Sequence, residues 1–127
     1  MFFKYNYDSF PLVNVKLFGY INNDDDFKKF MEEWLNIYNK KIDFEFVFDT
    51  KDLLGSDLKY TIYMAFFIKK IKSLKYKYLK HSKILLYNKF IYYMAKIIFI
   101  YEKPIAPIEI ILHNNNNNII NRELINP

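Results

Sequence analysis

The stretch that most constrains the fold is a phenylalanine-rich alternation near the middle of the chain. Between Ile42 and Asp49, every second position is apolar, and three of the four residues that alternate with them are acidic. A two-residue period is typical of a β-strand that buries one face. The next segment, Thr50–Gly55, predicts a loop, and Ser56 and Asp57 predict the start of a helix that extends to about Lys75. A strand that leads into a helix predicts an α/β domain, whose sites tend to lie at the carboxyl ends of the strands.

The rest of the chain supplies similar elements on both sides of this strand. Short apolar runs predict further strands, and the spacing of apolar residues after Asp24 and after Asn88 predicts two more helices. The expected strands are Phe2–Tyr7, Leu12–Ile21, Lys83–Tyr87 and Ile108–Leu112. Helices between strands imply parallel pairing with crossovers. We therefore expect a single α/β domain with a mixed β-sheet and the order β-β-α-β-α-β-α-β.

This domain is expected to cover residues 1–112. Residues 113–127 contain the run Asn114–Asn118, and polar tracts of this kind are usually flexible tails. The apolar segment Ile119–Ile125 is too short to assign to a helix or a strand.

Composition narrows the setting rather than the function. The chain has 127 residues, 52% of them hydrophobic, with no cysteine and a formal net charge of +5. The longest apolar runs are far shorter than the roughly 18 residues of a membrane span. An intracellular, cytoplasmic protein is expected, and the abundance of Asn, Ile, Lys, Phe and Tyr points to an A/T-rich genome. For a viral protein, the host cytoplasm or the virion would be the setting.

The element order and the central motif resemble the STAS domain of sulphate-transporter tails and anti-sigma-factor antagonists. Phe46-Val-Phe-Asp49 looks like the strand end of that family, and Leu54-Gly-Ser-Asp-Leu58 occupies its helix start. The resemblance implies a non-enzymatic regulatory module that binds a protein partner and is switched by phosphorylation. Ser56 matches the modified position, and Thr50 is the next candidate. The motif here is Gly-Ser-Asp rather than the Asp-Ser-Ser-Gly type of the family.

The same region is the expected partner surface on physical grounds. A hydroxyl at a helix start lies beside unpaired amides that attract anions, and a phosphate there would add close to two negative charges. The expected partner-binding residues are Asp49, Thr50, Asp52, Ser56, Asp57 and Lys59. The plainer interpretation is that Ser56 only caps the helix.

No pattern of residues indicates an enzyme, a metal site or a cofactor. The chain has two histidines and two glycines, too few for a typical zinc site or a glycine-rich phosphate loop. The consecutive acids Asp24, Asp25 and Asp26 point in different directions and are expected to start a helix. We therefore expect a protein without catalytic residues, metal or cofactor.

Two alternatives remain open. The first alternative is nucleic-acid binding, in which lysines neutralise phosphates and tyrosines stack on bases. The residues expected to bind are Lys69, Lys70, Lys72, Lys75, Tyr76, Lys77, Tyr78 and Lys80. A solvated lysine-rich helix end explains the same residues. The aromatic surplus also suits a self-associating structural component, a homo-oligomer whose exposed apolar patches pair subunits.

Overall fold

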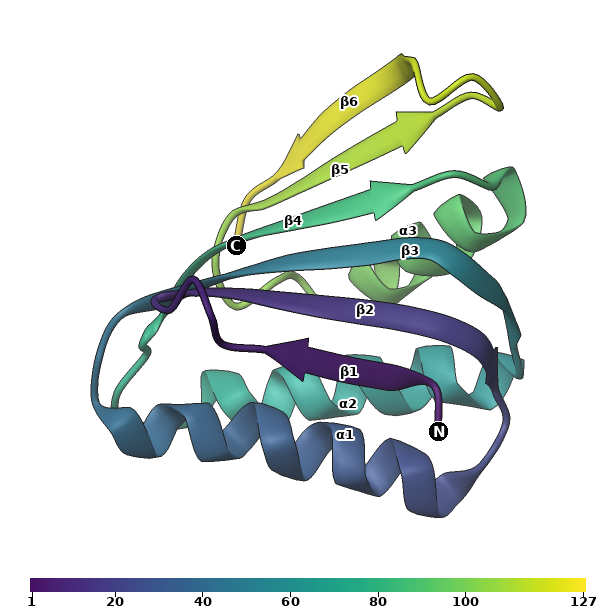
Figure 1. Ribbon diagram of the computed structural model, residues 1–127. Coiled ribbons are helices and arrows are strands. Elements are labelled where there is room, and N and C mark those ends of the chain that lie inside the picture. The colour runs from purple at the N-terminus through teal and green to yellow at the C-terminus, as the bar shows by residue number, and fades with distance from the viewer.

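The computed structural model describes residues 1–127 as one six-stranded sheet with three helices (Figure 1). The sheet consists of β1 (Phe3–Asn6), β2 (Leu12–Ile21), β3 (Phe44–Ser56), β4 (Leu79–Leu86), β5 (Ile108–His113) and β6 (Ile119–Ile125). The helices are α1 (Asp24–Ile37), α2 (Leu58–Lys72) and α3 (Lys89–Tyr101), with a 3-10 turn η1 (Tyr38–Lys40) after α1. The predicted mixed α/β sheet is confirmed.

The strands lie in the sheet in their sequence order, from β1 to β6. Strands β2 to β5 pair in parallel, whereas β1 and β6 pair antiparallel at the two edges. Each crossover from β2 to β5 therefore steps in the same direction, and right-handed crossovers of this kind place every helix on one face of the sheet. Figure 1 shows the three helices gathered on one side. The other face carries no helix.

Alternation in β3 explains how the sheet is covered. Phe44, Phe46 and Phe48 are buried under the helices, while Glu45 is exposed on the open face. The strand lies between β2 and β4, as expected for the strand around which the domain is organised. It continues to Ser56, so the loop predicted over Thr50–Gly55 is wrong. The register with β2 shifts twice, and these irregularities let the strand continue past Asp49 although the simple alternation ends there.

The last strand was not assigned from the sequence. Ile119–Ile125, within the segment expected to be a flexible tail, pairs with β5 as β6. The asparagine run forms the intervening turn: Asn114 Oδ1 accepts from the backbone amides of Asn116 (2.9 Å) and Asn118 (3.0 Å). Asn117 has a φ of 62°, a left-handed conformation that asparagine tolerates well. Because this sixth strand follows β5, the strand order differs from the STAS-like order that the sequence suggested, and that order is not confirmed.

The core has two parts of unequal size. The larger cluster of 18 buried residues lies mainly beneath α1 and α2 and includes Trp34, Phe46 and Phe67. The smaller cluster of six buried residues lies beneath α3 and includes Leu86, Ile91 and Ile110. Ile84 packs against both clusters.

Candidate functional site

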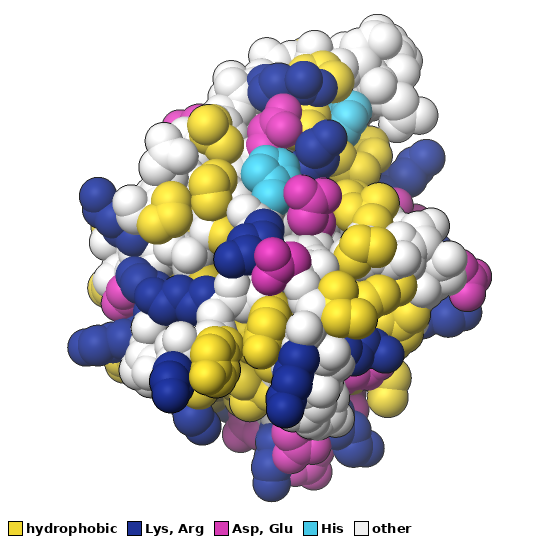
Figure 2. Space-filling model, turned by 90° about the vertical axis from the view of Figure 1, so that its left-hand side faces the viewer, with side chains coloured by type: hydrophobic (Ala, Val, Ile, Leu, Met, Phe, Trp, Pro, Cys, Tyr) yellow, Lys and Arg dark blue, Asp and Glu magenta, His cyan; other side chains and the backbone are white.

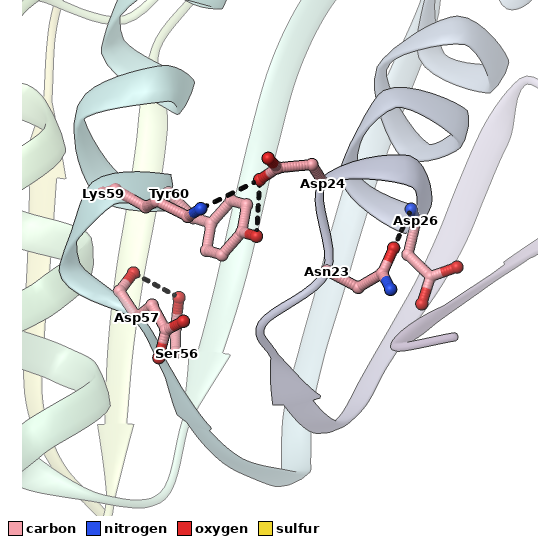
Figure 3. A network of polar contacts seen from close by, with 7 residues as sticks. All are labelled: Asn23, Asp24, Asp26, Ser56, Asp57, Lys59 and Tyr60. Carbon is pink, nitrogen blue, oxygen red and sulfur yellow. Dashed lines mark hydrogen bonds and ion pairs between the residues drawn. The ribbon is translucent and has the colours of Figure 1, made fainter.

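The end of β3 and the start of α2 hold the serine singled out by the sequence. Ser56 is the last residue of β3 and is half-buried, and Asp57 is the residue that precedes the first turn of α2. The Ser56 Oγ donates to the backbone carbonyl of Asp57 at 3.1 Å, and no side chain accepts from the first amides of the helix. The expectation that Ser56 caps α2 is therefore wrong: its hydroxyl points to a carbonyl rather than to the amides (Figure 3).

Thr50, the second phosphorylation candidate, lies inside the strand. It is 5% exposed, and its Oγ1 donates to the carbonyl of Leu85 in β4 at 2.7 Å. Its side chain thus supports the pairing of β3 with β4 beneath the helices. A kinase would have to unpair these two strands before it could reach this hydroxyl.

The other expected partner-binding residues do not form one surface. Asp52 is exposed and forms an ion pair with Lys16 of β2 at 2.9 Å, and Asp49 Oδ1 accepts from the amide of Lys51 at 2.9 Å. These acids belong to the strand, whereas Asp57 and Lys59 lie at the start of α2. The expected site divides because Thr50–Ser56 is an extended strand of about 3.3 Å per residue rather than a compact loop.

A polar network joins the starts of α1 and α2 (Figure 3). Asp24 Oδ1 accepts from the Tyr60 hydroxyl at 2.7 Å and pairs with Lys59 Nζ at 3.2 Å. The hydrogen bond from Tyr60, and then the contact with Lys59, lower the pKa of Asp24. The bond to Asp24 raises the pKa of Lys59. Asn23 caps α1, accepting from the Asp26 amide at 3.0 Å. The network links the starts of the two helices through Asp24, Lys59 and Tyr60.

The lysine-rich segment, residues 69–80, lies at the end of the strands opposite to Ser56 and the start of α2. Both α1 and α2 end on this side of the molecule. The exposed lysines there are Lys69, Lys70, Lys75, Lys77 and Lys80, together with Lys40 and Lys41 after α1. Figure 2 shows this side of the molecule, with dark-blue basic side chains spread over its lower part. Two residues predicted to bind nucleic acid, Lys72 and Tyr78, make contacts within the protein instead.

Lys72 Nζ pairs with Glu102 and donates to the Lys103 carbonyl at 3.0 Å. Tyr78 is half-buried against the larger core cluster, with its ring 6.1 Å from that of Tyr38. Tyr76, in contrast, is 60% exposed. The segment therefore presents most of its lysines and one of its two tyrosines to solvent.

A surface that the sequence reasoning did not single out follows the outer side of α3. We call it the α3 stripe: Phe90, Tyr93, Ile97, Ile100 and Tyr101. The first two are 60% exposed, Ile100 is 78% exposed and Tyr101 is 64% exposed. The spacing of three and four residues places them on one face of the helix. This spacing was present in the sequence, and Lys89 and Lys96 share it with Tyr93 and Ile100. The two lysines thus marked the outward face, a signal that the sequence reasoning did not use.

A cavity of about 160 Å³ lies between the sheet and the three helices α1, α2 and α3, and no sequence pattern indicates it. Of its 27 lining residues, 22 are hydrophobic and none is charged. Its walls include members of both core clusters, such as Phe48 and Leu86.

Comparison with known proteins adds no further constraint. No family model, curated protein or solved structure matches the chain. Within the structure, no group of three or more histidine or acidic side chains is placed to hold a metal ion. None of the helices has both the length and the apolar character needed to cross a membrane.

Proposed function

We propose that this protein is a non-enzymatic protein-interaction module whose contact surface is the α3 stripe. The observation that carries the proposal is the exposure of Phe90, Tyr93, Ile100 and Tyr101 on one helical face. Apolar side chains that are exposed singly are common, whereas a contiguous group on one element is typical of an interaction surface.

The partner proposed for this surface is a second copy of the chain. The α3 stripe contains no charged side chain, and apolar patches are self-complementary in the way that a two-fold dimer requires. Two identical basic patches would repel each other, so the lysine-rich end is not a candidate for the same contact. Two lysines border the stripe. Lys96 is paired with Glu123 of β6 at 3.3 Å and so is directed away from the stripe, and Lys89 is exposed at the start of α3.

Light scattering coupled to size-exclusion chromatography tests the dimer. We expect the mass of the wild-type protein to rise with concentration, and Tyr93→Glu to associate at least tenfold more weakly, about 1.4 kcal/mol or more. Tyr76→Glu is the matched control because both tyrosines are 60% exposed and only one belongs to the stripe. A wild-type protein that remains monomeric at every concentration, or equal weakening by both substitutions, would contradict the proposal.

The proposal includes regulation at Ser56, the position that the STAS resemblance selects. Its side chain is half-buried and close to Asp57. A phosphate there would be repelled by that carboxylate and would disturb the start of α2. Phosphosite mapping by mass spectrometry after incubation with lysate and ATP is the test. Absence of phosphate on Ser56 would remove the regulatory step and leave the dimer proposal unaffected.

A second candidate function, nucleic-acid binding, is favoured by one observation. Seven exposed lysines from the last turn of α2, the segments after α1 and α2, and the start of β4 lie at the same end of the parallel strands. Figure 2 shows basic side chains on this side of the molecule. Fluorescence anisotropy with single-stranded and duplex DNA tests this function. Binding should weaken as salt rises and should fall in the double variant Lys75→Glu, Lys77→Glu more than in Lys28→Glu on exposed α1. No binding at low ionic strength would exclude this function.

A further inference from the structure

The cavity between the sheet and the three helices lies where the two core clusters meet. Ile84 of β4 and Leu86 two residues later belong to its walls, together with Met64 of α2 and Ile98 of α3. None of its lining residues is exposed, but the space is not fully enclosed and opens partly towards solvent. Protein interiors are close-packed, and voids much larger than a water molecule are few. A void of about 160 Å³ therefore needs an explanation.

The lining determines the chemistry of what could fill it. Polar atoms interrupt the apolar walls at Thr50, Ser56, Thr61, Ser82, Tyr60 and Trp34. The Thr50 hydroxyl already donates to Leu85 and the Tyr60 hydroxyl to Asp24, whereas the Trp34 Nε1 has no hydrogen-bond partner. No charged side chain lines the space, so an ionised group buried there would have no partner and would be strongly disfavoured. An apolar cavity of about 150 Å³ in another protein stays free of water and binds benzene or xenon.

We propose that this cavity is a binding site for a neutral apolar ligand, a hydrocarbon group about the size of a benzene ring. The ligand would contact Leu86 on the sheet, Met64 on α2 and Met94 on α3, and methionine side chains adapt readily to irregular apolar shapes. The inference does not depend on the proposed dimer, since the α3 stripe lies on the outer side of the helix.

An NMR titration of the wild-type protein with benzene tests the site. We expect saturable chemical-shift changes at amides beside the cavity, including those of Ile84, Leu86 and Met94, and a rise in melting temperature. Benzoate, which adds a negative charge to a ring of the same size, is expected to give no saturable shift. Ala95→Leu adds volume at a half-buried lining position and should weaken benzene binding at least tenfold.

Leu54→Ala is the control variant, because Leu54 is 64% exposed and does not line the cavity; it should bind benzene as the wild type does. If Ala95→Leu does not fold, Ile98→Phe fills the same space from a position one turn further along α3. A wild-type protein with no saturable shift overturns the proposal. Undiminished benzene binding by whichever cavity-filling variant folds, Ala95→Leu or Ile98→Phe, also overturns the proposal, because benzene would then be binding elsewhere on the protein.

Discussion

The two halves of the helical layer are packed to different degrees. Beneath α1 and α2, Trp34 lies with its ring centroid 4.6 Å from that of Phe46 and 5.4 Å from that of Phe67. Beneath α3, the cluster has six buried residues, mostly aliphatic. The cavity is bordered by members of both clusters. Aromatic rings fill volume with few side-chain torsions, and edge-to-face pairs add ~0.5–1.5 kcal/mol beyond area burial. We infer that the aromatic packing beneath α1 contributes most of the stability, and that α3, with its exposed stripe, is free to bind a partner.

The largest effect is expected from truncation in the aromatic cluster. Phe46 is fully buried and lies against Trp34, Phe44 and Phe48. Phe46→Ala should lower the free energy of unfolding by about 3–5 kcal/mol, as large-to-small changes of buried aromatic residues do. Urea denaturation measures this loss. Phe66→Ala, at a 66% exposed phenylalanine of α2, is the control and should change stability by less than about 0.5 kcal/mol. Similar losses in the two variants would contradict the account.

Hydrogen exchange should separate the two regions without any substitution. Amides of α3 are expected to exchange at least tenfold faster than those of β3, because regions with few buried contacts open at lower free energy. Amides of α1 should resemble those of β3. Exchange measured by NMR gives this comparison directly, and equal protection of α3 and α1 would show that the packing difference has no dynamic consequence.

The cap of α3 provides a smaller test. Asn88 Oδ1 accepts from the amides of Phe90 (2.7 Å) and Ile91 (3.3 Å). Asn88→Ala should lower the free energy of unfolding by about 1 kcal/mol, and Asn88→Asp should retain most of the stability. Chemical denaturation distinguishes the two. A loss as large as that of Phe46→Ala would mean that α3 is more important for stability than its packing indicates.

The smallest effect concerns pH and the network between α1 and α2. Tyr60 and Lys59 lower the pKa of Asp24 in the folded protein. The contribution of Asp24 to the free energy of unfolding is therefore present above the ordinary pKa of an aspartate, and it is lost as pH falls through the lowered pKa of the folded state. Asp24→Asn should therefore narrow the difference in melting temperature between neutral and acidic solution. Asp25→Asn, at the neighbouring exposed carboxylate, is the control. If Asp24→Asn leaves the difference in melting temperature between neutral and acidic solution unchanged, the network contributes little to stability.

Much of the fold was predictable because local patterns agreed with the final packing. The two-residue alternation of β3, the spacing of α1 and the cap at Asn88 each identified an element correctly. The strand beyond Thr50 was missed because its register shifts break the alternation. The strand β6 was missed because the asparagine run resembles a flexible tail, although Asn114 and Asn117 build its turn.

The candidate site was less accessible to prediction. The exposure of Ile100 was indicated only by Lys96, one turn before it on the same face of α3, because the other residues of this helix are mostly apolar. The cavity depends on how side chains from distant segments, such as Phe48 and Ile98, meet in space. The cavity therefore arises from tertiary packing, and a single sequence carries no local signal for it.

The most direct test of the unequal packing is one substitution made in both regions. Ala95 of α3 lines the cavity, whereas Ala65 of α2 is buried and does not. Urea denaturation of Ala95→Leu should show a gain of about 0.5–2 kcal/mol, as cavity-filling changes do, and Ala65→Leu should show a loss of about 1–3 kcal/mol from overpacking. Destabilisation by both substitutions would contradict the claim that the α3 side contains usable empty space.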